Sequence, residues 1–321
     1  MSKIRFAIPK GSLERNTYLL LEQSGYRISG LERSYRPLIN DPDISLKILR
    51  PQEIPIYISE GLIDIGITGT DWIAEVNAEV KILLRLDYGF VKLVLAIPKE
   101  YGHVGTLSEL VREFNRLGRR LRISTEYLNL TCKYLMNNDE YLKLYGLQEP
   151  VTITPWWRKG SNVMVNVILS FGATEAKPPE DADAIVDVVE TGITLIQNNL
   201  KPIEVLMESC AVLISNKESL KDSIKREKIY DILALIKGVI DGRRRIHVFM
   251  NVKEENLNNI LSVIPALKSP TISPLSLKGW YAINTVIDKD EFLKILPLIR
   301  KFAQGIVVHE PRQVLSLDEV L

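Results

Sequence analysis

The segment from Asp183 to Leu195, DAIVDVVETGITL, constrains the fold of this chain more than any other. Apolar residues on both sides of Asp187 predict a buried strand, and the small residues between Glu190 and Thr194 interrupt it. Residues Leu195 to Gln197 are then expected to begin a helix. Strands that lead through short turns into helices are typical of α/β proteins, so we expect an α/β fold.

The same turn predicts a phosphate site. Backbone N–H groups at the start of a helix have no partner within it. Together with the helix dipole and the hydroxyls of Thr191 and Thr194, they favour a bound phosphate. Asp187 precedes the turn and could reach the hydroxyls of a sugar attached to that phosphate. An ordinary strand–turn–helix connection with Thr191 or Thr194 as N-cap explains the turn about equally well.

Composition excludes several classes of protein. A chain of 321 residues with 46% hydrophobic residues predicts two or three domains with a substantial core. With 41 basic and 40 acidic residues, the charge favours neither nucleic acid nor an acidic membrane as a partner. Only two cysteines, a polar N-terminus and no long apolar run predict a soluble cytoplasmic protein. The three histidines have no metal-ligand spacing, so we expect no zinc site.

The first third of the chain alternates between expected strands (4–8, 46–49, 63–68) and helices (13–24, from 50 towards 61, from 69). This order predicts a mostly parallel sheet with ligands beyond the carboxyl ends of its strands. The basic residues near those ends are Lys10, Arg15, Arg33 and Arg50. Lys10 and Arg50 each follow a strand and could hold a triphosphate or pyrophosphate. Taken one at a time, each is better explained as a solvated surface charge, whereas two at equivalent strand ends beside a phosphate turn favour a binding role.

A second lobe is expected after the apolar strand 91–98. It holds two helical stretches around the strand 121–124, and the strand 184–189 closes it. The strands 204–207 and 211–214 are expected to return to the first lobe. Glu175, after the strand 163–169, could orient a ribose hydroxyl or bind magnesium through water. Exposure in a proline-rich loop is an alternative for Glu175 and Asp183. Trp156 and Trp157 suggest a hairpin tip or an interface.

The C-terminal third predicts a separate module. A long helix (218–240) is followed by strands at 246–252, 280–287 and 306–309 and helices at 254–264 and 289–303. This order suggests a small ferredoxin-like module with one more strand hidden in the segment 265–274. We expect such a module to bind a regulatory small molecule or an identical partner.

Several motifs together resemble one family. In order they are IRFAIPKGSL from Ile4, LRPQEIPIY from Leu49, GLIDIGITGTDWI from Gly61, TEYLNLT from Thr125, and the segment from Asp183. A last motif, VIPALKSPTISPL, lies in the C-terminal module. These motifs resemble ATP phosphoribosyltransferase, the first enzyme of histidine biosynthesis, in its long form with a C-terminal regulatory domain.

The resemblance implies a two-lobed core like the type II periplasmic binding proteins and a ferredoxin-like (ACT-like) third domain. The implied divisions are 1–92 with 201–217 for lobe I, 93–200 for lobe II and 218–321 for the regulatory domain. The implied reaction is magnesium-dependent transfer of phosphoribose from phosphoribosyl pyrophosphate to ATP, which releases pyrophosphate. The family also implies feedback inhibition by histidine and a homo-oligomer, either a dimer or a hexamer.

The resemblance also assigns residues. Phosphoribosyl pyrophosphate would bind at Asp183, Asp187, Glu190, Thr191, Gly192, Ile193 and Thr194. ATP and pyrophosphate would contact Lys10, Gly11, Arg15, Arg50, Gly69 and Asp71. Asp187 and Glu175 would act electrostatically in catalysis, and Glu175 is also the candidate magnesium ligand. Histidine would bind near Ser269, Thr271 and Ser273.

Some residues depart from the family pattern. Ser12 stands where members usually have arginine, which Arg15 or Arg33 could replace. The segment from Gly172 to Glu175 replaces a G-S-V-E motif, the loop that follows lacks a glycine, and Leu128 replaces a proline. Residues 155–163 look inserted. The remaining alternatives are a two-lobed binding or sensor protein without catalysis and a phosphoribosyltransferase with another acceptor base.

Overall fold

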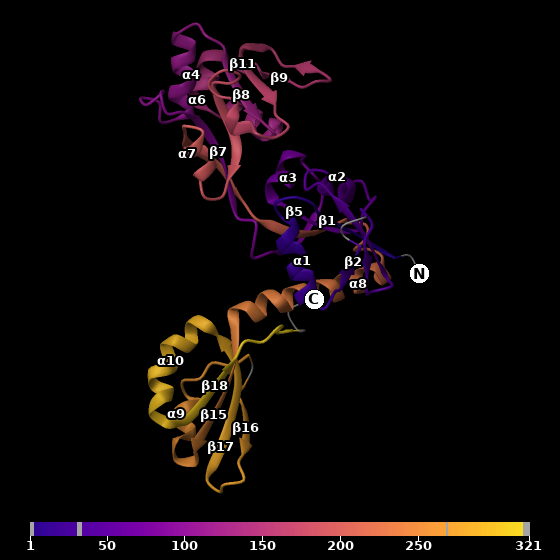
Figure 1. Ribbon diagram of the computed structural model, residues 1–321, viewed down its shortest axis with the longest axis vertical. Helices are drawn as coiled ribbons and strands as arrows, with labels where there is room; N and C mark the ends of the chain where they lie inside the picture. Colours follow the sequence, from indigo (N-terminus) through magenta and orange to yellow (C-terminus); the bar gives the residue numbers. More distant parts are fainter. Residues whose placement is uncertain (1–2, 31–33, 268, 317–321) are drawn as a thin grey trace. The chain divides into compact units, whose positions relative to one another are not determined.

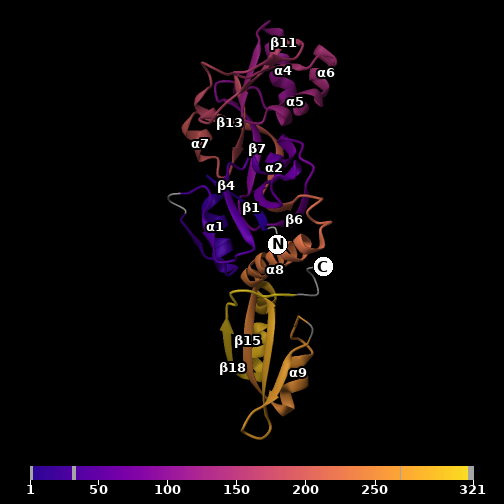
Figure 2. The same cartoon turned by 90° about the vertical axis from the view of Figure 1, so that its right-hand side faces the viewer.

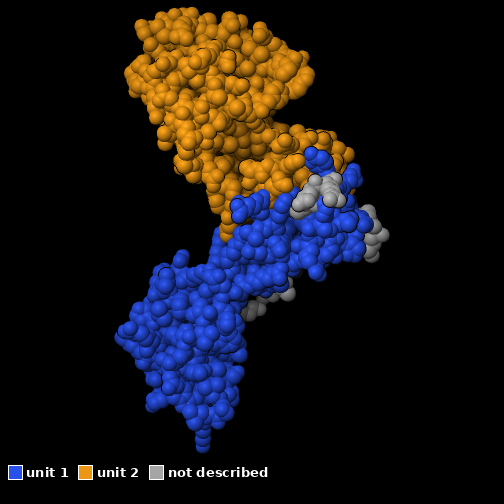
Figure 3. Space-filling view, viewed as in Figure 1, with its two compact units in different colours: residues 1–4, 15–46, 219–321 blue, residues 5–14, 47–218 orange. Residues whose placement is uncertain are grey.

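The computed structural model describes residues 3–30, 34–267 and 269–316. Two compact units make up the chain (Figure 3): residues 5–14 with 47–218, and residues 1–4 with 15–46 and 219–321. Among the described residues, no helix is both long and apolar enough to cross a membrane.

The first sheet has five strands in the order β4-β1-β5-β14-β6 (Figure 1). The strands are β1 (Ile4–Pro9), β4 (Ile44–Leu49), β5 (Ile65–Gly69), β6 (Lys81–Arg85) and β14 (Ala211–Ser215). Strands β1 and β5 are parallel as expected, whereas β14 runs antiparallel to β5 and β6. The associated helices are α1 (Glu14–Gln23), α2 (Ile54–Ser59) and α3 (Thr70–Glu75), and β2 (Ile28–Ser29) pairs with β3 (Leu38–Ile39).

The second sheet has seven strands in the order β10-β9-β11-β8-β12-β7-β13. They are β7 (Val91–Pro98), β8 (Leu121–Thr125), β9 (Pro150–Ile153), β10 (Arg158–Lys159), β11 (Asn162–Leu169), β12 (Ala184–Val189) and β13 (Leu200–Ser209). The helices are α4 (Leu107–Arg116), α5 (Leu128–Met136), α6 (Asp139–Tyr145), the short η1 (Thr174–Ala176) and α7 (Ile193–Gln197). Strands β9, β11, β8 and β12 are parallel neighbours. Their carboxyl ends therefore share one edge of the sheet.

One expected strand lies in the other sheet. The prediction that residues 204–207 return to the first lobe is wrong, because β13 pairs with β7 along most of its length, with Val205 opposite Val94. Only β14 joins the first sheet, where Leu213 lies opposite Ile67. The chain therefore crosses between the sheets twice, before β7 and after β13.

The C-terminal module has the expected ferredoxin-like topology. Helix α8 (Ser223–Arg244) leads into β15 (Arg245–Lys253), η2 (Glu254–Asn256), α9 (Leu257–Leu261), β16 (Thr271–Pro274), β17 (Trp280–Asp288), α10 (Lys289–Phe302) and β18 (Ala303–His309). The sheet order is β16-β17-β15-β18, with antiparallel neighbours throughout, so β16 is the strand predicted in the Pro/Ser-rich segment. Alternate residues of β15 are buried in one core with α9 and α10, which cover the same face (Figures 1 and 2).

Helix α8 begins later than the expected residue 218 because Asp222 caps it, accepting hydrogen bonds from the N–H groups of Ile224 and Lys225 at 3.0 and 3.1 Å. The same compact unit includes residues 15–46. There Lys228 of α8 pairs with Asp41 at 2.8 Å, and Arg312 donates to the carbonyl of Glu22 at 2.6 Å.

Candidate functional site

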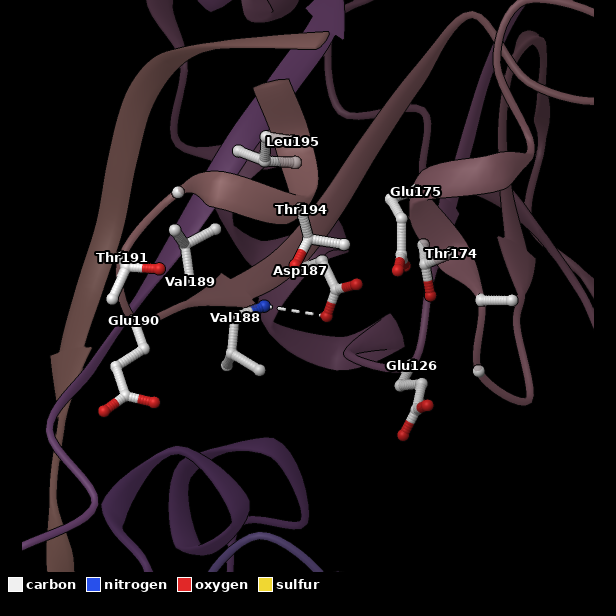
Figure 4. A pocket seen from close by; sticks show the side chains of 13 residues that line it. Glu126, Thr174, Glu175, Asp187, Val188, Val189, Glu190, Thr191, Thr194 and Leu195 are labelled. Atoms are coloured by element: carbon white, nitrogen blue, oxygen red, sulfur yellow. Dashed lines mark hydrogen bonds between the residues drawn. The ribbon is translucent and has the colours of Figure 1, made fainter. Parts of the chain in front are cut away.

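A pocket of about 390 Å³ lies at the carboxyl end of β12, where the sequence predicts a phosphate turn (Figure 4). It is lined by Glu126, Gly172, Ala173, Thr174, Glu175, Asp187, Val188, Val189, Glu190, Thr191, Gly192, Thr194 and Leu195. The lining comes from the loops that follow the parallel strands β8, β11 and β12. The pocket thus occupies the edge at which ligands of α/β sheets bind.

Asp187 is the half-buried carboxylate at the centre of this pocket. It lies in β12, accepts a hydrogen bond from the N–H of Val188 at 2.7 Å and points toward the same space as Glu175 (Figure 4). Burial, followed by the negative charges of Glu175 and Glu126, raises the pKa of Asp187 to about 6. The carboxylate is therefore ionised above neutral pH but held at a free-energy cost that a bound cation or cationic sugar would relieve.

The turn differs from the alternative in which Thr191 or Thr194 caps the helix. Gly192 is the N-cap of α7 and has a φ of +79°, a left-handed conformation that glycine adopts without strain. No side chain caps the helix, so neither Thr191 nor Thr194 is the N-cap. Among the described residues, the hydroxyls of Thr191 and Thr194 donate to no protein group, which leaves them available to a ligand. Ile193 is exposed and does not line the pocket.

Glu126 is a pocket residue that the sequence analysis missed. It follows β8, which lies beside β12 in parallel, and it accepts a hydrogen bond from Nε2 of Gln52 at 3.3 Å. The position directly after a parallel strand was the signal that could have identified it. With Glu175, Asp187 and Glu190 it makes the pocket strongly acidic, and no lysine or arginine is among the described lining residues.

This donor set fits magnesium only in part. No group of three or more His, Cys, Asp or Glu side chains among the described residues is arranged to hold a metal ion. Magnesium, however, is usually held by one or two carboxylates together with substrate phosphates and water. The carboxylates of Glu175 and Asp187, directed into one space, match that need.

Asp183 lies outside this pocket. Its side chain is 1% exposed and accepts hydrogen bonds from the backbone N–H and the guanidinium of Arg122 at 2.9 to 3.1 Å. Arg119 lies 3.5 Å from the same carboxylate. The structure does not support the prediction that Asp183 binds the sugar donor, because its oxygens are paired with Arg122 outside the pocket.

The basic residues predicted for the ATP wall are partly brought together. Lys10 and Arg50 follow the neighbouring strands β1 and β4, and the Lys10 N–H donates to the carbonyl of Leu49 at 2.8 Å. Gly11 adopts a φ of +96° in the next turn, and Arg15 is exposed in the first turn of α1. Arg33 lies outside the described residues.

Asp71 is buried rather than presented to a ligand. Its carboxylate accepts hydrogen bonds from the hydroxyl of Tyr127 at 2.6 Å and from that of Ser209 at 2.7 Å. The carboxylate also lies against Gly69, where any added Cβ would collide with it. The predicted direct contact of Asp71 with pyrophosphate is therefore not supported, since both of its oxygens are engaged. Gly69 instead makes room for that carboxylate.

Glu75, on the same helix as Asp71, also bonds to the segment after β8. It accepts hydrogen bonds from the N–H groups of Asn129 and Leu130, each at 2.9 Å, at the start of α5. Trp72 stacks on Tyr127 with ring centroids 4.4 Å apart. Helix α3, beside the first sheet, is thereby joined to the loop that carries Glu126.

Two of the three residues predicted to bind histidine lie on a strand. Thr271 and Ser273 belong to the exposed edge strand β16, where they pair with Asn284 and Ala282 of β17. Ser269 is exposed just before that strand. Thr271 and Ser273 thus lie on the strand predicted in this segment, and their binding of histidine stays a prediction.

Comparison with known proteins identifies relatives over nearly the whole chain. The sequence model of ATP phosphoribosyltransferase matches residues 50–238, and that of the HisG C-terminal domain matches residues 243–310. An ATP phosphoribosyltransferase of Thermodesulfovibrio yellowstonii is 35% identical over 97% of this chain and 98% of its own length. That of Solibacter usitatus is 37% identical over 95% of this chain and 96% of its own length.

A solved structure is similar as well. A chain in the ATP phosphoribosyl transferase (HisG:HisZ) complex from Thermotoga maritima is 26% identical and superposes with a TM-score of 0.55. The match covers 73% of this chain and 96% of that chain.

Proposed function

The chain belongs to the ATP phosphoribosyltransferase family, and we propose that the pocket at the end of β12 binds its phosphoribosyl donor. The family activity transfers phosphoribose to ATP in histidine biosynthesis, which disfavours a binding protein without catalysis. The observation that carries the proposal is the gathering of Asp187, Glu190, Thr191, Gly192 and Thr194 around one pocket.

Each part of the pocket suits one part of the donor. The hydroxyls of Thr191 and Thr194 and the backbone of the Gly192 turn would donate to the 5′-phosphate. Helix α7 has only five residues, so its dipole contributes less than a long helix would. Asp187 would accept hydrogen bonds from the ribose hydroxyls, just before the turn.

The acidic lining supports an electrostatic role in catalysis. Adenine is a weak nucleophile, so the rate depends on ionising the bond between sugar and pyrophosphate and on holding the base in line. The carboxylates of Asp187 and Glu175 would stabilise positive charge as it develops on the ribose. We assign them this role rather than that of a general base.

Magnesium would enter with the donor. Glu175 and Asp187 would hold the ion on one side, and it would supply positive charge for the departing pyrophosphate. Lys10 and Arg50, at the ends of neighbouring strands, would contact ATP or pyrophosphate, with Gly11 in the same turn. Arg15 remains a candidate for the missing family arginine.

The C-terminal module would carry regulation. Its ferredoxin-like topology and its match to the HisG C-terminal domain support feedback inhibition by histidine near Ser269, Thr271 and Ser273. We also propose a homo-oligomer, a dimer or a hexamer, that acts in the cytoplasm. The balanced charge of the chain supports neither nucleic acid nor membrane as a partner.

Turnover tests the proposed function directly. The purified chain is incubated with ATP, phosphoribosyl pyrophosphate and magnesium, and the absorbance of phosphoribosyl-ATP is followed. We expect product only when all three are present, with other purine triphosphates as control acceptors. Binding of the donor without product, or faster transfer to another base, would contradict the proposal.

A further inference from the structure

An exposed aromatic pair lies beside the phosphate-turn pocket. Trp156 is 73% exposed and Phe171 is 71% exposed, and their rings meet edge to face with centroids 6.0 Å apart. Large aromatic side chains are mostly buried in folded proteins, and exposed ones that cluster commonly mark a contact surface. The exposure of both rings at one place therefore suggests a contact surface.

The pair is continuous with the pocket through the chain. Phe171 directly precedes Gly172 and Ala173, which line the pocket on the side of Glu175. Both lining residues have positive φ angles, +102° and +48°, so the backbone turns sharply between the aromatic ring and the carboxylate. Phe171 is therefore one residue away from the pocket lining, and Trp156 is in ring contact with it.

The hairpin that carries Trp156 is well ordered by hydrogen bonds. Oγ1 of Thr154 accepts from the N–H groups of Trp156 and Trp157 at 3.3 and 3.1 Å, and the Thr154 N–H donates to the carbonyl of Trp157 at 3.0 Å. These bonds close the turn between β9 and β10, which pair antiparallel. The turn fixes the backbone of Trp156 while leaving its ring exposed, which favours preorganised binding.

The pocket itself has nothing suited to a purine base. Its described lining consists of carboxylates, hydroxyls, glycines and aliphatic side chains, with no aromatic ring. A base stacks on aromatic rings, and each such stack contributes substantially to nucleotide affinity. We propose that Trp156 and Phe171 form the stacking surface for the adenine of ATP. The inference rests on the proposed function of the adjacent pocket.

Charge next to the aromatic pair suits the same ligand. The hairpin continues into Arg158, which is exposed and forms no ion pair within the described parts of the chain. Lys159 follows it but lines the separate pocket of Trp157. A base that carries a triphosphate would find both an aromatic face and positive charge on this hairpin. The acidic pocket, by contrast, would receive the sugar of the donor.

The test compares Trp156→Leu and Phe171→Ala with the unmodified full-length chain. ATP binding is measured by calorimetry, and KM for each substrate is measured by turnover. We expect both variants to bind ATP about tenfold more weakly, within the range of one lost base stack. KM for phosphoribosyl pyrophosphate is expected to change less than twofold. Trp156→Phe keeps an aromatic face and should restore the affinity for ATP.

Trp157→Leu is the matched control. Trp157 lies on the same hairpin but lines a different pocket, together with Cys132 and Thr152, so its loss should leave ATP binding unchanged. Unchanged ATP affinity in the Trp156 and Phe171 variants would overturn the inference. So would a change in oligomeric state with normal ATP binding, which would identify a contact with a second copy. A chain that binds ATP at the aromatic pair but forms no product would contradict only the proposed function.

Discussion

At the scale of single residues, Asp187 combines a cost to stability with a proposed role in catalysis. Its pKa rises from 3.8 to about 6 on folding, mainly through burial, so the folded chain binds the proton more tightly than the unfolded chain. The resulting stabilisation is complete below pH 3.8 and is lost as the pH rises through 6. We predict that Asp187→Asn is more stable than the unmodified chain at pH 8 by about 1–3 kcal/mol.

The same substitution should lower turnover, since asparagine cannot stabilise positive charge on the ribose. The measurements are denaturant unfolding at pH 5 and pH 8 and the pH profile of kcat/KM, which we expect to rise through about pH 6 in the unmodified chain. Asp183→Asn is the comparison, because that substitution removes the charge that pairs with Arg122 and should destabilise the chain. A stability gap for Asp187→Asn that is equal at both pH values would refute the assignment.

At the scale of elements, pattern and spacing predicted most of the fold. The strands 91–98 and 184–189 were predicted at their observed bounds, because each is mostly apolar, interrupted only by Lys92 and Asp187 respectively, and lies between polar turns. Which strands pair, and which side chains bond to each other, could not be predicted from these patterns. The pairing of β13 with β7 and the ion pair of Asp183 with Arg122 depend on contacts between distant segments. Glu126 follows an expected strand, but its place in the pocket depends on β8 lying beside β12, which neither segment shows by itself.

The turn between β12 and α7 carries the second prediction at this scale. Thr191→Ala removes one hydroxyl donor to the phosphate and should weaken binding of phosphoribosyl pyrophosphate by about 1.5–3 kcal/mol. Gly192→Val should weaken it as well, because its φ of +79° strains any other residue. ATP binding should change little. Asn198→Ala is the control, since Asn198 donates to the Thr194 carbonyl at 2.9 Å but does not line the pocket. Calorimetry that found equal losses for both substrates would identify the turn as purely structural.

At the scale of the whole molecule, the C-terminal module and helix α8 belong to the same compact unit as residues 15–46. Residues 15–46 cluster with residues 219–321, and α8 is tied to them by the ion pair of Lys228 with Asp41 and by the Arg243–Gln23 hydrogen bond at 2.7 Å. The tail after β18 packs on α8, where a Cβ added at Gly238 would collide with Leu315 and one added at Gly242 would be tightly packed against Gln313. A cut before α8 would therefore remove packing from residues 15–46 as well as the regulatory module.

This arrangement determines how feedback by histidine should be tested. A chain ending after Arg244 keeps α8 and its ion pair with Asp41 but lacks the sheet β15–β18 and the tail that packs on α8. We predict that histidine inhibits the full chain, whereas the shortened chain keeps its turnover and is not inhibited, because an effector acts only through a site it can bind. Circular dichroism and thermal unfolding would verify that the shortened chain is folded. In the full chain, Thr271→Ala should raise the histidine concentration needed for half-inhibition without changing KM for ATP. Inhibition that persists after truncation would locate the effector site outside the module.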